Sequence, residues 1–207
     1  IVLDVGCGNG ELLVRALEHT GGTGLGIEPN PAFAAAARLR IVDCELDATI
    51  VEERWSDLSP TPDGVALAIC TGSLHAFGSY GDALRTLHGV VAPGGLALLG
   101  PGYWKQTPDA EYLAALGASA DEMHDWPGTL AQAAAAGWHV RDSHTSTLAE
   151  WDAYEQAYER NVRVWCEAHA EDPEAQAFLT RIEHWSTLVA TGGRDTMGYG
   201  LVLLQRD

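Results

Sequence analysis

Basic residues are scarce in this chain. It carries 12 Lys and Arg against 29 Asp and Glu, which gives a formal net charge of −17. A surface of this sign repels phosphate backbones and anionic lipids, so a protein that wraps nucleic acid or lies on an acidic membrane is disfavoured. No apolar run reaches the roughly 20 residues that a membrane-spanning helix needs, and no signal-peptide pattern is present.

Cysteine and histidine offer no structural framework. The cysteines are scattered and form no C-x-x-C pair, which favours four reduced thiols in a cytoplasmic protein: Cys7, Cys44, Cys70 and Cys166. The eight histidines show no metal-ligand spacing, so we expect no metal. The chain opens inside an apolar run without Met, and we expect further residues upstream that could include a targeting segment.

What the chain does have is apolar material for one core. It is 207 residues long, with 46% apolar and 20% charged residues, as in a globular protein rather than a disordered one. This length allows one sizeable core with a small appendage. We therefore expect a single domain over residues 1–207.

The first thirteen residues combine an apolar run, three glycines and a helical pattern. The run 1–5 is typical of a buried strand, Gly6, Gly8 and Gly10 alternate after it, and apolar residues recur at helical spacing from Glu11 onward. Glycines can take positive φ and let a ligand approach the backbone. The helix start behind them presents free N–H groups and a positive dipole end. This stretch predicts a strand, a turn and a helix around a ligand.

The spacing of the glycines separates two classes of ligand. A dinucleotide site requires G-x-G-x-x-G/A, and here the third small position is Glu11, whose carboxylate would meet the pyrophosphate. A nicotinamide-dependent oxidoreductase is therefore the less favoured alternative. The pattern Asp4-x-Gly6-x-Gly8-x-Gly10 instead resembles motif I of class I S-adenosylmethionine (SAM) dependent methyltransferases.

A second acidic position follows about twenty residues later. An apolar strand over 24–27 ends in Glu28-Pro29-Asn30-Pro31. In nucleoside-binding α/β folds an acid at the tip of the second strand accepts hydrogen bonds from the ribose hydroxyls, and Glu28 fits that place. Asn30 can cap the following helix, with Pro31 at its first position.

Three further strands are expected, over 49–53, 65–70 and 96–100. After the strand over 49–53, which is the third of the chain, the resemblance implies an acid that binds the adenine amino group. Asp57 is the available acid, while Trp55 or Ser56 stands in the usual position; a plain loop acid is the alternative. The fourth strand ends in Thr71-Gly72-Ser73, beside the first strand, where doubly wound sheets bind ligands.

The passage from 81 to 100 gives a second match to the family. A helical pattern over 81–91 ends at Pro93-Gly94-Gly95, and an apolar strand follows it. Gly100-Pro101-Gly102-Tyr103-Trp104 then leaves that strand. Helices over 109–116 and 129–136, and strands over 138–146 and 197–205 after a Gly192-Gly193 turn, complete the pattern.

About fifty residues separate the last two expected strands. Thr147 and Glu150 have the spacing of a capping box, and Asp172-Pro173 starts a second helix. Apolar and aromatic residues at helical spacing predict a hairpin of two amphipathic helices over Leu148–Ala190. The hairpin either packs its aromatic stripes on the sheet or forms a lid over the ends of the strands.

The resemblance, which covers residues 1–146 and 194–207, implies both fold and cofactor. The fold is α/β: a doubly wound, seven-stranded, mostly parallel sheet of order 3-2-1-4-5-7-6 with the last strand antiparallel and the hairpin inserted before it. The cofactor is SAM, with S-adenosylhomocysteine (SAH) as product. The expected cofactor-binding residues are Asp4, Gly6, Cys7, Gly8, Asn9, Gly10, Glu28, Pro29, Asn30, Trp55, Ser56, Asp57, Thr71, Gly72 and Ser73.

The expected reaction is direct displacement, in which N, O, S or C of a small-molecule acceptor attacks the methyl carbon. His75 is the first candidate base, Tyr103 the second and His124 the third, with a structural histidine as the alternative for His75. The acceptor is expected to meet His75, Tyr103, Trp104, Trp151, Tyr154 and Tyr158. The chain resembles an uncharacterised bacterial branch of small-molecule methyltransferases. We expect a cytoplasmic monomer or homodimer without nucleic-acid or membrane partners. A SAM-binding protein without transfer activity is the other alternative.

Overall fold

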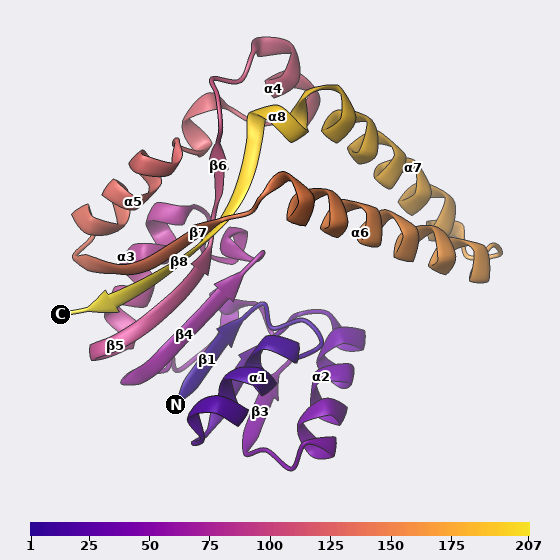
Figure 1. Ribbon diagram of the computed structural model, residues 1–207. Coiled ribbons are helices and arrows are strands. Elements are labelled where there is room, and N and C mark those ends of the chain that lie inside the picture. Colours follow the sequence, from indigo (N-terminus) through magenta and orange to yellow (C-terminus); the bar gives the residue numbers. More distant parts are fainter. The chain divides into compact units, whose positions relative to one another are not determined.

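The computed structural model describes residues 1–207, which divide into two compact units. Unit 1 comprises Ile1–Pro101, Pro127–His144 and Leu201–Asp207, and unit 2 comprises Gly102–Trp126 and Thr145–Gly200. Strands and helices alternate along most of the chain (Figure 1). None of the helices is both long enough and apolar enough to cross a membrane.

The strands form an 8-stranded sheet of order β3-β2-β1-β4-β5-β8-β6, with β7 paired to β8. Neighbours among the first five strands run parallel, whereas β8 runs antiparallel to β5 and to β6. Their bounds are β1 Val2–Val5, β2 Gly24–Ile27, β3 Ala48–Val51, β4 Val65–Thr71, β5 Val91–Gly100, β6 Gly102–Trp104, β7 Trp138–Thr145 and β8 Met197–Arg206.

Four α-helices and two short 3-10 turns accompany the strands of unit 1. They are α1 Glu11–Thr20, α2 Pro31–Asp43, α3 Tyr80–Val90 and α5 Trp126–Ala135, with turns at Trp55–Asp57 and Leu74–Phe77. α1 and α2 bury their apolar sides in one cluster with β1, β3 and β4, which includes Leu13, Leu17, Ile41, Ile50 and Ile69. Figure 1 shows α3 on the other face of the sheet. This part of the chain is therefore wound on both faces.

Unit 2 is mainly helical. It contains α4 Ala110–Leu116, a 3-10 turn Ala120–Glu122, α6 Leu148–Ala168, α7 Pro173–Leu188, a π-helical turn Val189–Gly193 and the short α8 Arg194–Thr196. α6 starts with a capping box in which Thr147 Oγ1 accepts from the N–H of Glu150 at 3.2 Å and Glu150 Oε2 accepts from the N–H of Thr147 at 2.8 Å. Asp172 caps α7, with Pro173 at its first position.

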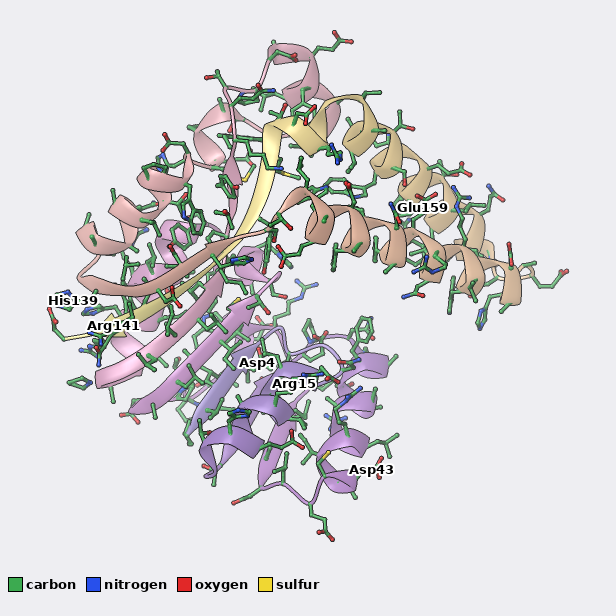
Figure 2. The ribbon with its side chains drawn as sticks, viewed as in Figure 1. Asp4, Arg15, Asp43, His139, Arg141 and Glu159 are labelled. Atoms are coloured by element: carbon green, nitrogen blue, oxygen red, sulfur yellow. The ribbon has the colours of Figure 1, made fainter.

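The two long helices pack against each other as an antiparallel hairpin. Val162, Cys166, Ala175 and Ile182 form its buried cluster. Polar contacts also join the helices: Trp185 Nε1 donates to Glu155 at 2.7 Å, and Ser186 Oγ donates to Glu159, labelled in Figure 2, at 3.0 Å.

The predicted fold class and strand order are confirmed. β7 and β8 stand in the places expected for strands six and seven, and β8 is antiparallel to its neighbours. The sequence predicted seven strands, and the eighth is β6, whose residues Tyr103 and Trp104 pair with Gly198 and Met197. The ring of Tyr103 lies against Gly198, where a Cβ would come within 2.4 Å of it. A strand of three residues that starts at a glycine after Pro101 is too short to show a strand period.

Three features differ most from the expected ones. β5 starts at Val91 rather than Leu96, because Pro93-Gly94-Gly95 bulges out between the pairs Val65–Val91 and Leu67–Leu96. α5 starts at Trp126 rather than Thr129. The expected Gly192-Gly193 turn is a π-helical turn that continues α7.

Candidate active site

The glycine turn after β1 has the conformation that its composition predicts. Gly6, Gly8 and Gly10 have φ of +73°, +55° and +78°, where other residues are strained. A Cβ on Gly6 would lie 2.2 Å from Ser73 Oγ, and one on Gly10 would lie 3.1 Å from the Cβ of Ala37, so both positions also lack space. A Cβ on Gly8 would meet nothing within 4 Å. Gly8 is therefore the position where the turn borders open space.

Glu28 is held by two backbone hydrogen bonds, one of them from this turn. Its side chain is buried, with the residue only 7% exposed. Oε2 accepts from the N–H of Gly8 at 2.9 Å, and Oε1 accepts from the N–H of Asn30 at 2.8 Å. Each carboxylate oxygen can accept a further hydrogen bond, since it has two lone pairs. Two preorganised oxygens at the end of β2 are suited to a pair of neighbouring hydroxyl groups.

A cavity of about 470 Å³ opens beside Glu28 in unit 1. Its lining comes from the carboxyl ends of β1, β2 and β4 and from the segment after β3: Val5, Gly6, Ile27, Glu28, Pro29, Arg54, Trp55, Ser56, Ser73, His75 and Ala76. This is the edge at which open α/β sheets bind ligands. The volume lies within the roughly 300–1,000 Å³ that small-molecule sites occupy.

Asp4 lies on β1, directly before the cavity residues Val5 and Gly6, and is labelled in Figure 2. It is only 3% exposed. Burial raises the pKa of Asp4 from 3.8 to about 7, and the negative charge of Glu28 adds to the rise. Glu28 and Asp4 thus place two buried carboxyl groups near one another at the ends of the neighbouring strands β1 and β2. A ligand with positive charge would reduce the cost of ionising Asp4.

The thiols near the site are not poised for nucleophilic chemistry. Burial raises the pKa of Cys7 and of Cys70 to about 12, with the charge of Asp4 adding to each rise. Both stay protonated at neutral pH, whereas a nucleophilic cysteine needs its thiolate form. All four cysteines of the chain are free thiols.

The predicted cofactor residues fall into two groups. Those that line the cavity are Gly6, Glu28, Pro29, Trp55, Ser56 and Ser73. Among the others, the Asn30 side chain caps α2 by accepting from Ala32 and Phe33. Asn9 Oδ1 accepts from the N–H of Glu11 at 3.3 Å, and Asp57 accepts from Ser56 Oγ at 2.9 Å. Asp4, Cys7, Gly8, Gly10, Thr71 and Gly72 belong to the turn and the strand ends and do not line the cavity itself.

Sequence reasoning missed two positions with side chains of interest at the cavity. Arg54, after β3, borders the cavity, and its side chain forms no hydrogen bond or ion pair. Phe77 packs its ring on Trp55 at 5.1 Å between centroids and so supports one wall. The signal for Arg54 was its place one residue before Trp55.

The predicted catalytic and substrate residues are distributed over both units. His75 lies in the 3-10 turn after β4 and lines the cavity of unit 1. In unit 2, Tyr103 is buried and its ring lies 5.1 Å from that of Trp126, while Trp104 is buried and donates from Nε1 to the carbonyl of Ala120 at 2.9 Å. The carbonyl of His124 accepts from the N–H of Trp104 at 2.8 Å.

The three aromatic residues predicted on α6 differ in exposure. Trp151 is only 8% exposed, whereas Tyr154 and Tyr158 are 68% and 42% exposed. The two tyrosine rings stack in parallel, with centroids 6.4 Å apart. α6 therefore presents an aromatic pair to its surroundings one turn after a buried indole.

Part of the chain matches a known protein family, and the whole chain resembles one bacterial protein. Residues 2–95 match the family described as "Methyltransferase domain". The chain is 28% identical over 211 residues to the uncharacterized protein YjhP of Escherichia coli (strain K12), an alignment that covers 98% of the chain and 83% of that protein.

Two solved structures extend this likeness over the whole chain. A SAM-dependent methyltransferase from Geobacter sulfurreducens in complex with SAH is 27% identical with a TM-score of 0.87, and the match covers 100% of this chain and 84% of that one. A SAM-dependent methyltransferase from Thiobacillus denitrificans, also in complex with SAH, is 25% identical with a TM-score of 0.85 and the same coverage.

Residues 2–95 therefore match a methyltransferase domain, and the whole chain is similar to SAM-dependent methyltransferases. Its cofactor is SAM, and the resemblance of Asp4-x-Gly6-x-Gly8-x-Gly10 to motif I of this family is confirmed. The nicotinamide-dependent alternative is thereby set aside. The methyltransferase cofactor also suits the geometry of unit 1, because the cavity combines two free acceptor positions on Glu28 with the aromatic wall of Trp55.

Proposed function

We propose that this methyltransferase transfers the methyl group of SAM to a small-molecule acceptor by direct displacement. The observation that carries the proposal is the cavity of about 470 Å³ built around Glu28. Its volume suits small molecules. The net charge of −17 argues against a nucleic-acid acceptor, because phosphate backbones would be repelled.

The residues around the cavity have distinct roles in holding the cofactor. Glu28 is fixed by the N–H groups of Gly8 and Asn30. Its remaining lone pairs accept hydrogen bonds from the ribose hydroxyls. Pro29 and Trp55 supply apolar surface for the adenine ring. When bound, SAM supplies an electrophilic methyl group on a sulfonium. The chain itself then acts mainly by positioning the acceptor and excluding water.

We assign the role of general base, where the acceptor needs one, to His75. It lines the cavity, and histidine is the side chain that most often serves as a general base. Tyr103, the second candidate, has a packing role against Gly198 and Trp126 that accounts for its burial without chemistry. His75→Gln should therefore reduce turnover more than Tyr103→Phe does.

We further propose that the helical hairpin, Leu148–Ala190, is a lid that helps to form the acceptor pocket. Its support is the stacked pair Tyr154 and Tyr158, which is too exposed to serve the packing of α6 on α7. Exposed aromatic surface of this kind is typical of binding faces. That the protein is cytoplasmic and acts as a monomer or homodimer stays our prediction from the sequence.

Calorimetric titration combined with a turnover assay tests the proposed function. SAM and SAH should bind the intact chain, and Glu28→Gln should weaken both by roughly 1.5–3 kcal/mol, the worth of hydrogen bonds to a charged group. Arg38→Gln is the control, because it removes an exposed ion pair with Glu52 outside the cavity. SAH release with a panel of small acceptors should follow. Tight SAM binding with no release across the panel would favour a SAM-binding protein without transfer activity.

A further inference from the structure

Unit 2 contains a buried hydrogen-bond donor without a partner. Trp151, on the first turn of α6, is 8% exposed, and its Nε1 is one of two buried side-chain polar atoms that lack a partner, the other being Tyr80 Oη. The indole N–H groups of Trp104, Trp138 and Trp185 all donate to oxygens at 2.7–3.1 Å. A buried donor without a partner is costly, and an acceptor group of a bound ligand would satisfy it.

Lys105 supplies a second donor beside this indole. Its ammonium lies 5.1 Å from the centroid of the Trp151 ring, a cation–π contact. Nζ donates one hydrogen bond, to the carbonyl of Arg194 at 2.8 Å, which leaves two of its three N–H bonds available. Desolvation by burial lowers the pKa of Lys105. The ammonium therefore gains from any anion that approaches it.

The charges around Lys105 indicate what kind of anion fits. Arg194 binds Asp152 through two parallel hydrogen bonds of 2.7 and 2.8 Å, so that carboxylate is already committed to the guanidinium. Asp195, which is exposed, contributes negative charge near Lys105. With two cations and two carboxylates the cluster has no net positive charge, so nothing in it compensates the second charge of a dianion such as phosphate. A carboxylate has one charge and two oxygens, one for each donor.

We propose that Lys105 and Trp151 together bind a carboxylate group of the methyl acceptor. The acceptor class is then a small carboxylic acid, held by one ammonium and one indole N–H. This assignment rests on the proposed function, since it takes the bound acid to be the acceptor. Binding of the acid to unit 2, however, can be measured without any methyl transfer.

The direct test follows the indole N–H signals in two-dimensional N–H correlation spectra of the full chain. Trp151→Phe assigns the signal of Trp151 among the seven tryptophans. Para-hydroxybenzoate is the probe, since it combines a carboxylate with a hydroxyl that could accept a methyl group, and para-hydroxybenzamide is its uncharged match. At millimolar concentrations the acid should shift the Trp151 signal and the amide should not. The Trp138 signal is the internal control, because its N–H is bound to the carbonyl of Leu84.

Two variants test the donors separately. Lys105→Met keeps the aliphatic stem and should weaken binding of para-hydroxybenzoate about ten- to a hundredfold, as should Trp151→Phe when binding is followed by calorimetry. Arg160→Gln removes an unpaired cation of α6 and is the charge-matched control, with an unchanged dissociation constant expected. No shift of the Trp151 signal, an equal shift with the amide, or unchanged binding to Lys105→Met would each overturn the proposal.

Activity measurements separate this proposal from the proposed function. If SAH is released with carboxylic acids and Lys105→Met raises KM for them with little change in kcat, both proposals hold. If the wild-type chain methylates only uncharged acceptors, the carboxylate assignment is overturned while the proposed function stands. If the acid binds at Trp151 but no acceptor yields SAH, the site stands as an acid-binding site and the methyl-transfer proposal fails.

Discussion

At the scale of the residue, Gly8 tests whether the cofactor uses the open side of the turn. Gly8→Val places a side chain where a Cβ meets nothing, so it causes strain at φ +55° without a clash. SAM affinity should fall by at least about tenfold, because the side chain occupies space beside Glu28 and disturbs the N–H that orients it. Gly64→Val is the matched control, since Gly64 has φ +64° and equally open surroundings outside the cavity.

Both variants should lose a similar amount of stability, roughly 1–2 kcal/mol, because the left-handed conformation costs any residue with a Cβ about that much. Only Gly8→Val should lose SAM affinity in calorimetric titration. An equal loss of affinity in the two variants would mean that the effect is strain alone. Unchanged affinity in both would place the cofactor elsewhere.

Asp4 predicts how stability depends on pH. The pKa of its carboxyl group is 3.8 when the side chain is fully hydrated, as in the unfolded chain, and about 7 in the folded chain, so folding takes up a proton between these values. Stability therefore falls as the pH rises from about 4 to about 7 and is flat above that range. Asp4→Asn should remove this dependence and make the chain more stable than wild type above pH 7, by up to about 4 kcal/mol. Urea unfolding at about pH 5 and pH 8 measures the difference, which should be larger at the higher pH.

The sequence predicted the place of residues that follow a recognisable strand. Glu28 was selected because an acid at the end of the second strand is where nucleoside-binding folds hold the ribose, and it lines the cavity, while its contact with the ribose stays a prediction. Arg54 was missed, since nothing in a single arginine shows whether it meets an acid or stays free. The sequence could not predict that the indole N–H of Trp151 lacks a hydrogen-bond partner either, because this depends on which residues from distant segments surround it.

At the scale of the element, the capping box at the start of α6 should contribute measurably to the stability of the chain. Thr147→Ala removes the oxygen that accepts from the N–H of Glu150, and the chain should lose about 1 kcal/mol of stability. Thr180→Ala is the control within the same hairpin. Its Oγ1 bonds only to the carbonyl of Gln176 in the interior of α7, where alanine is the better helix former. Denaturant midpoints should fall for the first variant and stay or rise for the second.

Elements with a clear period were predicted well, and those fixed by tertiary contacts were not. The hairpin helices follow from apolar spacing and caps, and the structure confirms them as α6 and α7. β6 has no period and exists because β8 pairs with it and Gly198 makes room for Tyr103. β5 starts early because Gly95 fits where a Cβ would lie 3.0 Å from the carbonyl oxygen of Val65, a contact with another strand.

At the scale of the whole molecule, the lid proposal predicts a division of labour along the chain. The cavity residues all belong to unit 1, whereas the hairpin belongs to unit 2. Cofactor binding should then depend on unit 1 alone, and recognition of the acceptor on both. The hairpin starts after β7 and returns through α8 into β8, so it can be removed without interrupting a strand.

Deleting Leu148–Ala190 behind a short glycine linker tests this division. SAM affinity should fall only modestly, and turnover of any identified acceptor should vanish, because an open site admits water and loses the aromatic surface. Because the deletion could also disturb folding, a double variant tests the same prediction more gently. Tyr154→Ala with Tyr158→Ala removes two exposed rings, and it should raise KM while leaving stability nearly unchanged. Val164→Ala, also exposed on α6, should leave KM unchanged. If the truncated chain methylates the acceptor at the original rate, the hairpin is not a lid.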